Sequence, residues 1–375
     1  MNIPEIVIQS RFKETKEFMC RLWRGEIRGA LAYVVPSPAD VMPSTCEFKS
    51  DYYPEKFLYG VLNSLASRRW GHDYAVPMIQ SISYGGGVMA TAYGSQYNEI
   101  YNYTASCIHS ADQIDSLNLN PTLTDGLLGK ALDLIRYVVD QTKGQIPIQM
   151  YNAGGPMDIA SMVLWDKELL TALYTHPKKV HQLLDSCTEL YIAFYKAQQQ
   201  IIPEFVPVLS DDMYVPDGHG ILCGEDWLSV ISPDLALEFE IPYINRISDA
   251  FKGVAIHACG NLAYQFENLK KNVCNLRGIY FNAGECSFQS AVDTFRGTDV
   301  VLMPRWALNH PYTCKSRLDF VKKLLAMKTD DVNVYLIASY SAHPELMDKD
   351  PYGMAEDIIK YIEQYNEKKQ YNCEQ

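Results

Sequence analysis

The sequence predicts a (β/α)8 TIM barrel with an N-terminal helical extension. Short apolar segments recur along the chain, and each ends in a polar or small residue before an amphipathic helical pattern begins. Strands that alternate with helices in this way are typical of a parallel sheet covered by helices. About eight such units fit after the N-terminal part, which is the number that closes a TIM barrel.

The chain of 375 residues divides into three expected parts. Residues 1 to 70 carry mainly amphipathic helical patterns and are predicted to form the N-terminal extension. The barrel is expected over residues 71 to 365. Residues 366 to 375 are predicted to be a polar, frayed tail.

Several apolar segments are expected to be strands of the barrel. Ser232 and Pro233 are typical of a helix start, and Pro242 is expected to bend the helix that follows. Because TIM barrels build their active sites at the carboxyl ends of the strands, the residues after each apolar segment are the first candidates for function. The segments cover residues 146–151, 205–209, 254–256, 278–281, 300–303 and 332–337.

Composition limits the class of partner and the compartment. The net charge is −12 and no basic stripe is visible, so we expect no nucleic-acid binding. The ten cysteines show no regular framework, which favours free thiols in a reducing cytoplasm. The first residues do not resemble a signal peptide, and no apolar run reaches the roughly 18 residues of a membrane span.

The most informative motif is His257-Ala258-Cys259-Gly260, at the end of an apolar segment. Residues two apart on a strand point to the same face, so His257 and Cys259 would present an imidazole and a thiolate side by side. These are ligands that zinc prefers. The alternative is a buried cysteine beside a hydrogen-bonded histidine.

Other polar residues are expected near the mouth of the barrel. Asp211 and Asp212 follow an apolar segment and are candidates to orient substrate or a metal-bound histidine, with a helix cap or a loop salt bridge as the alternative. His219, in a Gly-rich turn, is a further candidate catalytic residue.

Three residues are candidates for binding a cofactor or substrate. Asn152 and Gly154 stand in a turn that would let the backbone approach a ligand, although a tight strand-to-helix turn explains them equally well. Arg305 follows another apolar segment and is predicted to bind a carboxylate, or else to form a surface salt bridge.

Taken together, several segments resemble the uroporphyrinogen decarboxylase superfamily, over roughly residues 60 to 365. That superfamily folds as a (β/α)8 barrel. The segments are Gly155-Pro156-Met157-Asp158-Ile159-Ala160, Leu169-Leu170, residues 176–184, Ile231-Ser232-Pro233 to Pro242-Tyr243, and Ile256-His257-Ala258-Cys259-Gly260-Asn261.

The superfamily has two main branches, and the sequence departs from both. The arginine-rich N-terminal loop of the decarboxylases has no match near Arg21, Arg24 or Arg28. The corrinoid-dependent methyltransferases carry zinc on His-x-Cys and a later Cys, but residues 338–341 are Ala-Ser-Tyr-Ser. The resemblance is closer to the methyltransferase branch, which is similar to methylcobamide:thiol enzymes.

A different third zinc ligand is suggested by a second resemblance. Cobalamin-independent methionine synthase, also a zinc barrel, has His-x-Cys followed by a Glu, and Glu285 stands at the end of the next expected strand. Neighbouring strands are about 5 Å apart, so His257, Cys259 and Glu285 can converge on one ion. Cys286 is the competing third ligand. The fourth ligand is open between water, the substrate thiol, Cys223 and Tyr340, which is also a candidate catalytic residue.

The resemblance implies a zinc-dependent transfer of a methyl group between a corrinoid and a small methyl donor or acceptor, preferably a thiol. Zinc with three protein ligands keeps one position open and favours the thiolate, which is the nucleophile. No corrinoid-binding motif is visible in the chain, so the corrinoid is expected on a separate partner protein. The alternatives are a uroporphyrinogen decarboxylase and a non-catalytic barrel that only docks a corrinoid protein.

Overall fold

A parallel sheet of six strands forms the centre of the fold, in the order β1-β10-β9-β8-β7-β6. The computed structural model describes residues 12–35, 54–67, 73–80, 85–98, 103–208, 213–306, 314–338 and 350–373. The six strands are β1 (Leu31–Val34), β6 (Ile221–Gly224), β7 (Val254–Ala258), β8 (Leu276–Asn282), β9 (Val301–Arg305) and β10 (Asn333–Ile337).

Backbone hydrogen bonds continue from both edges of this sheet. A parallel pair, β4 (Ile148–Gln149) and β5 (Phe205–Val206), is joined to β6 by the Leu222 N–H, which donates to the Pro207 carbonyl at 2.9 Å. At the other edge, the Tyr74 N–H donates to the Tyr33 carbonyl beside β1 at 2.9 Å, and a bridge from residue 79 reaches β4. These bonds extend the arrangement of the sheet beyond β1 and β6, and the predicted TIM-barrel-like fold is confirmed.

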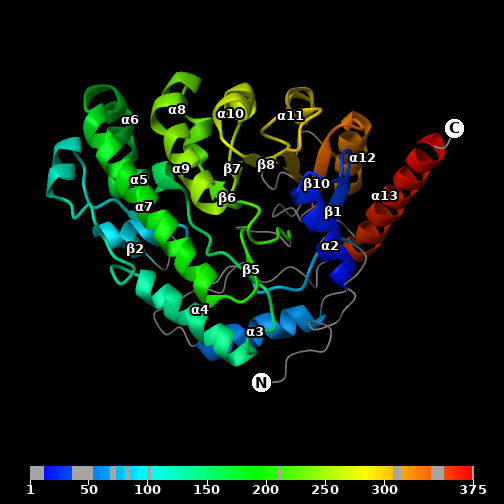
Figure 1. Ribbon diagram of the computed structural model, residues 1–375, viewed down its shortest axis with the longest axis horizontal. Coiled ribbons are helices and arrows are strands. Elements are labelled where there is room, and N and C mark those ends of the chain that lie inside the picture. The colour runs from blue at the N-terminus through cyan, green and yellow to red at the C-terminus, as the bar shows by residue number, and fades with distance from the viewer. Residues whose placement is uncertain are drawn as a thin grey trace.

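Helices lie outside the strands, and α8, α10, α11 and α12 form an arc along β6 to β10 (Figure 1). None of the helices in the described ranges has both the length and the apolar character needed to cross a membrane. The α-helices are α2 (Phe12–Trp23), α3 (Pro54–Ser67), α4 (Leu128–Thr142), α5 (Pro156–Val163), α6 (Asp166–Thr175), α7 (Pro177–Ile201), α8 (Pro233–Phe239), α9 (Ile241–Phe251), α10 (Phe266–Asn272), α11 (Phe288–Phe295), α12 (Arg317–Met327) and α13 (Pro351–Cys373).

Short elements connect these layers. Two of the 3₁₀ turns, η4 (Asp226–Ser229) and η5 (Ala263–Gln265), follow β6 and β7 and line the edge that carries the candidate site. The other short elements are the 3₁₀ turns η2 (Met89–Tyr93) and η3 (Ala111–Ser116) and the antiparallel strands β2 (Gln96–Asn98) and β3 (Tyr103–Ala105).

The helix expected after Ser232 is present but is divided in two. The Ser232 hydroxyl accepts the Leu235 N–H at 3.3 Å and caps α8, and Pro233 is its first residue. The helix breaks at Glu240, and Pro242 lies in the first turn of α9, as expected for a residue that cannot donate to the preceding turn. The break leaves the Glu240 side chain buried.

Two regions differ from the expected helical extension and tail. Residues 31–34, within the expected extension, form β1, which pairs with β10 through Leu31 and Val334. All four of its residues are buried, so the segment lacks the polar alternation that identifies a strand in a sequence. Helix α13 runs to Cys373, through most of the predicted tail. The boundary at residue 70 remains a prediction.

If β1 is a strand of the central sheet, truncating its core side chain costs stability. Val34 has no exposed surface, and we expect Val34→Ala to lower the free energy of unfolding by about 2 kcal/mol through lost burial and a residual cavity. The exposed Lys13→Ala in α2 is the control and should change it by less than about 0.5 kcal/mol. Urea denaturation measures both, and equal effects would contradict the assignment of β1.

Candidate metal centre

The imidazole of His257 is held in one orientation at the carboxyl end of β7. Its Nδ1 lies 3.2 Å from the Tyr280 carbonyl oxygen on β8, and its ring packs on the Tyr280 ring with centroids 4.4 Å apart. A carbonyl only accepts hydrogen bonds, so Nδ1 carries the proton and Nε2 has its lone pair available. The Cys259 Sγ lies 3.6 Å from that Nε2.

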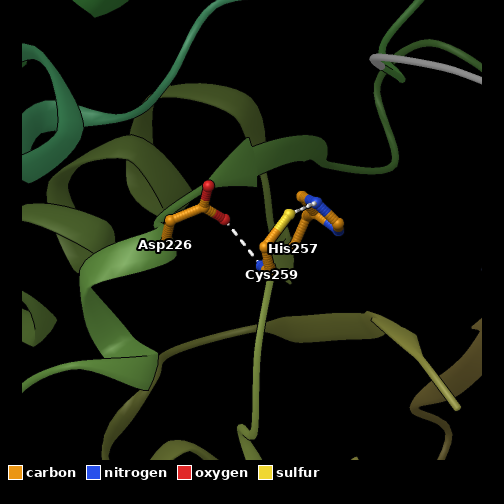
Figure 2. Close-up of side chains that lie close together, drawn as sticks. All are labelled: Asp226, His257 and Cys259. Atoms are coloured by element: carbon orange, nitrogen blue, oxygen red, sulfur yellow. Dashed lines mark hydrogen bonds between the residues drawn. The ribbon is translucent and has the colours of Figure 1, made fainter. Parts of the chain in front are cut away.

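Asp226 completes a group of three donors. It is the first residue of η4, directly after β6, and its Oδ1 accepts the Cys259 N–H at 2.6 Å. One ligand atom each from Asp226, His257 and Cys259 lies within 4.8 Å of the others (Figure 2). Nitrogen, thiolate sulfur and carboxylate oxygen are the donor types that zinc binds, so the predicted pairing of His257 with Cys259 is part of a set that suits a metal ion.

Sequence reasoning missed Asp226 because it did not recognise β6. The signal was present: the apolar run Ile221-Leu222-Cys223 is followed by Gly224 and two acidic residues. A polar residue after an apolar segment is the pattern that identified His257 as a candidate, and Asp226 shows the same pattern.

The Cys259 thiol carries its proton in the metal-free protein. Burial raises the pKa of Cys259 to about 12, and the negative charge and hydrogen bond of Asp226 add to the effect. The Glu285 charge raises this pKa further, whereas the Arg305 guanidinium lowers it. A bound cation reverses this balance because metals bind the thiolate.

Glu285 lies beside the three donors, but its carboxylate is hydrogen-bonded to the backbone and to a neighbouring side chain. Its Oε2 accepts the Gly260 N–H at 2.9 Å and the Asn282 side-chain amide at 2.8 Å. Its neighbour Cys286 is buried, with its sulfur near the backbone N–H groups of Leu262 and Ala263, and burial raises its pKa to about 12. The two competing third ligands therefore contact different parts of the loop after β7. They lie in a turn, in which both backbone N–H groups donate to the Asn282 carbonyl, and not on an extended chain.

The predicted ligand-binding residues lie at this edge of the sheet. Arg305 ends β9 and pairs in register with Asn282, and its charge acts on Cys259. Gly154 forms a parallel bridge with Gly224 at the end of β6, and Asn152 is exposed two residues earlier. Their roles in binding a cofactor remain predictions.

The remaining predicted catalytic residues do not join the three donors. His219 precedes β6 and accepts the Arg24 Nε–H at 3.1 Å, so it lies at the amino end of the strand, opposite to Asp226. β6 separates His219 from the edge that carries the three donors, and a catalytic role for this residue stays a prediction. Asp211, Asp212 and Tyr340 lie outside the described residues.

A cluster of buried acidic side chains lies behind the three donors. Asp158, Glu225 and Glu240 are at most 8% exposed, and desolvation raises the pKa of each well above its usual range, with further increases from neighbouring negative charges. In the part of the chain that the structure describes, neither Glu240 oxygen has a hydrogen-bond partner. Cys223 is fully buried on this inner side, with its Sγ 3.9 Å from Glu225 Oε1.

Fold and site define a TIM-barrel-like protein with a group of His, Cys and Asp donors, of the types that bind metal ions, at the carboxyl ends of adjacent strands. The family model of uroporphyrinogen decarboxylase (URO-D) matches residues 65–302. The chain belongs to the uroporphyrinogen decarboxylase family, as its motifs predicted.

Comparison with other known proteins gives a likeness in fold. A solved structure, a methyltransferase from Methanosarcina mazei, is similar with a TM-score of 0.56 and 15% sequence identity, over 76% of this chain and 81% of that one. No curated protein matches the chain in sequence.

The high pKa of Cys259 predicts slow alkylation of the metal-free protein. At pH 8 nearly all of the Cys259 thiol is protonated, and the thiolate is the form that iodoacetamide attacks, so Cys259 should react more slowly than Cys274 although both side chains are exposed. Asp226→Asn removes a negative charge, lowers this pKa, and should accelerate the reaction. Mass spectrometry of the modified peptides over pH 7 to 10 measures both rates. A faster reaction at Cys259 than at Cys274 would contradict the prediction.

Proposed function

We propose that the protein is a zinc-dependent methyltransferase that moves a methyl group between a corrinoid protein and a small acceptor or donor, with a thiol as the preferred acceptor. One observation carries the proposal: the convergence of a His nitrogen, a Cys sulfur and a carboxylate oxygen within 4.8 Å at the carboxyl ends of adjacent strands. Family membership and the fold shared with a methyltransferase support it.

The ligands would be His257 Nε2, Cys259 Sγ and one carboxylate. We favour Asp226 over Glu285, the residue that the sequence suggested, because the Asp226 oxygens lie within reach of both other donors. Oδ1 of Asp226 accepts the Cys259 N–H, and this bond holds the carboxylate beside the thiol (Figure 2). Glu285 would then hold the Gly260 turn through its own hydrogen bond.

Three protein ligands leave one coordination position open. When bound, zinc would take a substrate thiol at that position as the thiolate, the reactive form for accepting a methyl group. The residues of the chain hold the donors in place: Tyr280 fixes the His257 ring, and Asp226 and Glu285 hold the backbone at Cys259 and Gly260. Arg305 adds a positive charge at the same edge, suited to orienting an anionic group of the substrate.

Zinc analysis of the purified protein tests the ligand set. We expect about one zinc per chain, lost in Cys259→Ala and in Asp226→Ala, and retained in Glu285→Gln. Exposed Asp234→Ala is the matched control and should keep its zinc. Loss of zinc in the Glu285 variant with retention in the Asp226 variant would reverse the assignment of the third ligand.

Methyl transfer tests the activity itself. With methylcobalamin as the donor and a small thiol as the acceptor, the zinc-loaded protein should demethylate the corrinoid, and Cys259→Ala should lower the rate at least about 100-fold because the metal centre is lost. The visible spectrum of the corrinoid follows the reaction.

A parallel assay with uroporphyrinogen separates this function from its main alternative. Turnover of the tetrapyrrole, with no methyl transfer to any thiol tested, would show a decarboxylase instead.

A further inference from the structure

The acidic side chain that follows the Gly154-Gly155-Pro156 turn lies directly behind the candidate metal centre. Asp158 is in the first turn of α5, and it is only 8% exposed. Its carboxylate instead accepts the Asp226 N–H, at 3.1 Å to Oδ1 and 3.2 Å to Oδ2, and the Trp227 N–H lies close to it. Asp158 therefore fixes the backbone from which the Asp226 side chain extends.

A second acidic residue makes the opposite contact: Glu225, in the loop after β6, lies against the start of α5. The Glu225 carboxylate lies near the backbone N–H groups of Met157 and Asp158, which favour its charged form. The Gly155 N–H donates to the Gly224 carbonyl at 2.5 Å. The turn before α5 and the loop after β6 are thus held together by groups from both sides.

Both glycines of the turn are required by this close approach. A Cβ on Gly154 would lie 2.5 Å from the Asp158 Cβ, and a Cβ on Gly155 would lie 2.3 Å from Glu225 Oε1. Neither contact is tolerated by ordinary side chains. The glycines that the sequence offered as a ligand-binding turn thus make room for the two carboxylates.

We infer that Asp158 is a positioning residue of the metal centre, which holds Asp226 so that its carboxylate stays beside Cys259 and His257. The connection is short: Asp158 binds the Asp226 backbone, and the Asp226 side chain binds the Cys259 N–H at 2.6 Å. Residues that orient metal ligands from behind typically contribute about 10- to 100-fold to metal affinity. The inference rests on the proposed function, because it assumes that Asp226 binds the ion.

The zinc dissociation constant, measured by competition with a chelator, tests the inference. We expect Asp158→Ala to bind zinc about 10- to 100-fold more weakly than the wild type. Asp158→Asn keeps one acceptor oxygen and should show a smaller loss, and it serves if the alanine variant does not fold. Asp234→Ala, an exposed first-turn Asp of α8, should bind as the wild type does. Thermal unfolding of the metal-free variants checks that each is folded.

A double-mutant cycle separates positioning from a general effect on the fold. In an Asp226→Ala background, which should no longer retain zinc on purification, the weak binding of added zinc is titrated instead, and Asp158→Ala should cause no further loss of affinity because its connection to the ion through Asp226 has been removed. Additive losses would overturn the inference. Cobalt substitution adds a spectroscopic readout: the visible bands of the bound ion should shift in Asp158→Ala, and unchanged bands with unchanged affinity would also overturn it.

The outcomes for the two proposals are distinct. Failure of the wild type to bind zinc would remove the proposed metal centre and this inference with it. Zinc binding that depends on Asp226 and is insensitive to both Asp158 variants would leave the proposed function in place and overturn the inference alone.

Discussion

The hydrogen bond from the Cys259 N–H to the Asp226 carboxylate is the interaction on which the site depends. It joins the loops after two neighbouring strands, beyond the point where Gly224 pairs with His257 and the Glu225 N–H donates to the His257 carbonyl. Sheet pairing alone brings the strand ends together, but it does not set where the side chains beyond the last pair point. This bond places the carboxylate beside the thiol and so determines the spacing of the three donors.

The register of the sheet fixes the other half of the geometry. Because β7 and β8 pair with His257 opposite Tyr280, the imidazole packs on the tyrosine ring, and its Nδ1–H points to the Tyr280 carbonyl. That contact selects the tautomer whose Nε2 can bind a metal. A shift of one residue would turn the histidine to the other face of the sheet. Correct pairing of these two strands is therefore a condition for the geometry of the candidate site as well as for the fold.

The sequence allowed the fold class and two of the three donors of the candidate site to be predicted, and the limits have physical causes. Periodicity identified β7 and the strands after it because each apolar run is long or ends in a clear polar signal, and His257 and Cys259 followed from β7. β1 and β6 have only four residues each and are buried throughout, so no alternation marks them. Without β6, Asp226 had no strand end to belong to and His219 had no strand to separate it from the mouth. The position of Asp158 behind Asp226 could not be predicted, since hydrogen bonds between loops that are distant in the chain leave no pattern in the local sequence.

The buried acidic cluster is hard to explain as a device for stability. Asp158, Glu225 and Glu240 are withdrawn from water, and the charge of Asp158 raises the pKa of both glutamates. Burial of carboxylates without full compensation lowers the stability of a fold, and apolar side chains of similar size would serve it better. Buried groups that lower the stability of the fold in this way are expected at functional sites. A cation at the three donors would supply positive charge in front of this cluster, which would favour the charged form of the carboxyl groups and offset part of the cost of burying them. The cluster thus connects the electrostatics of the interior with the chemistry proposed at the edge of the sheet.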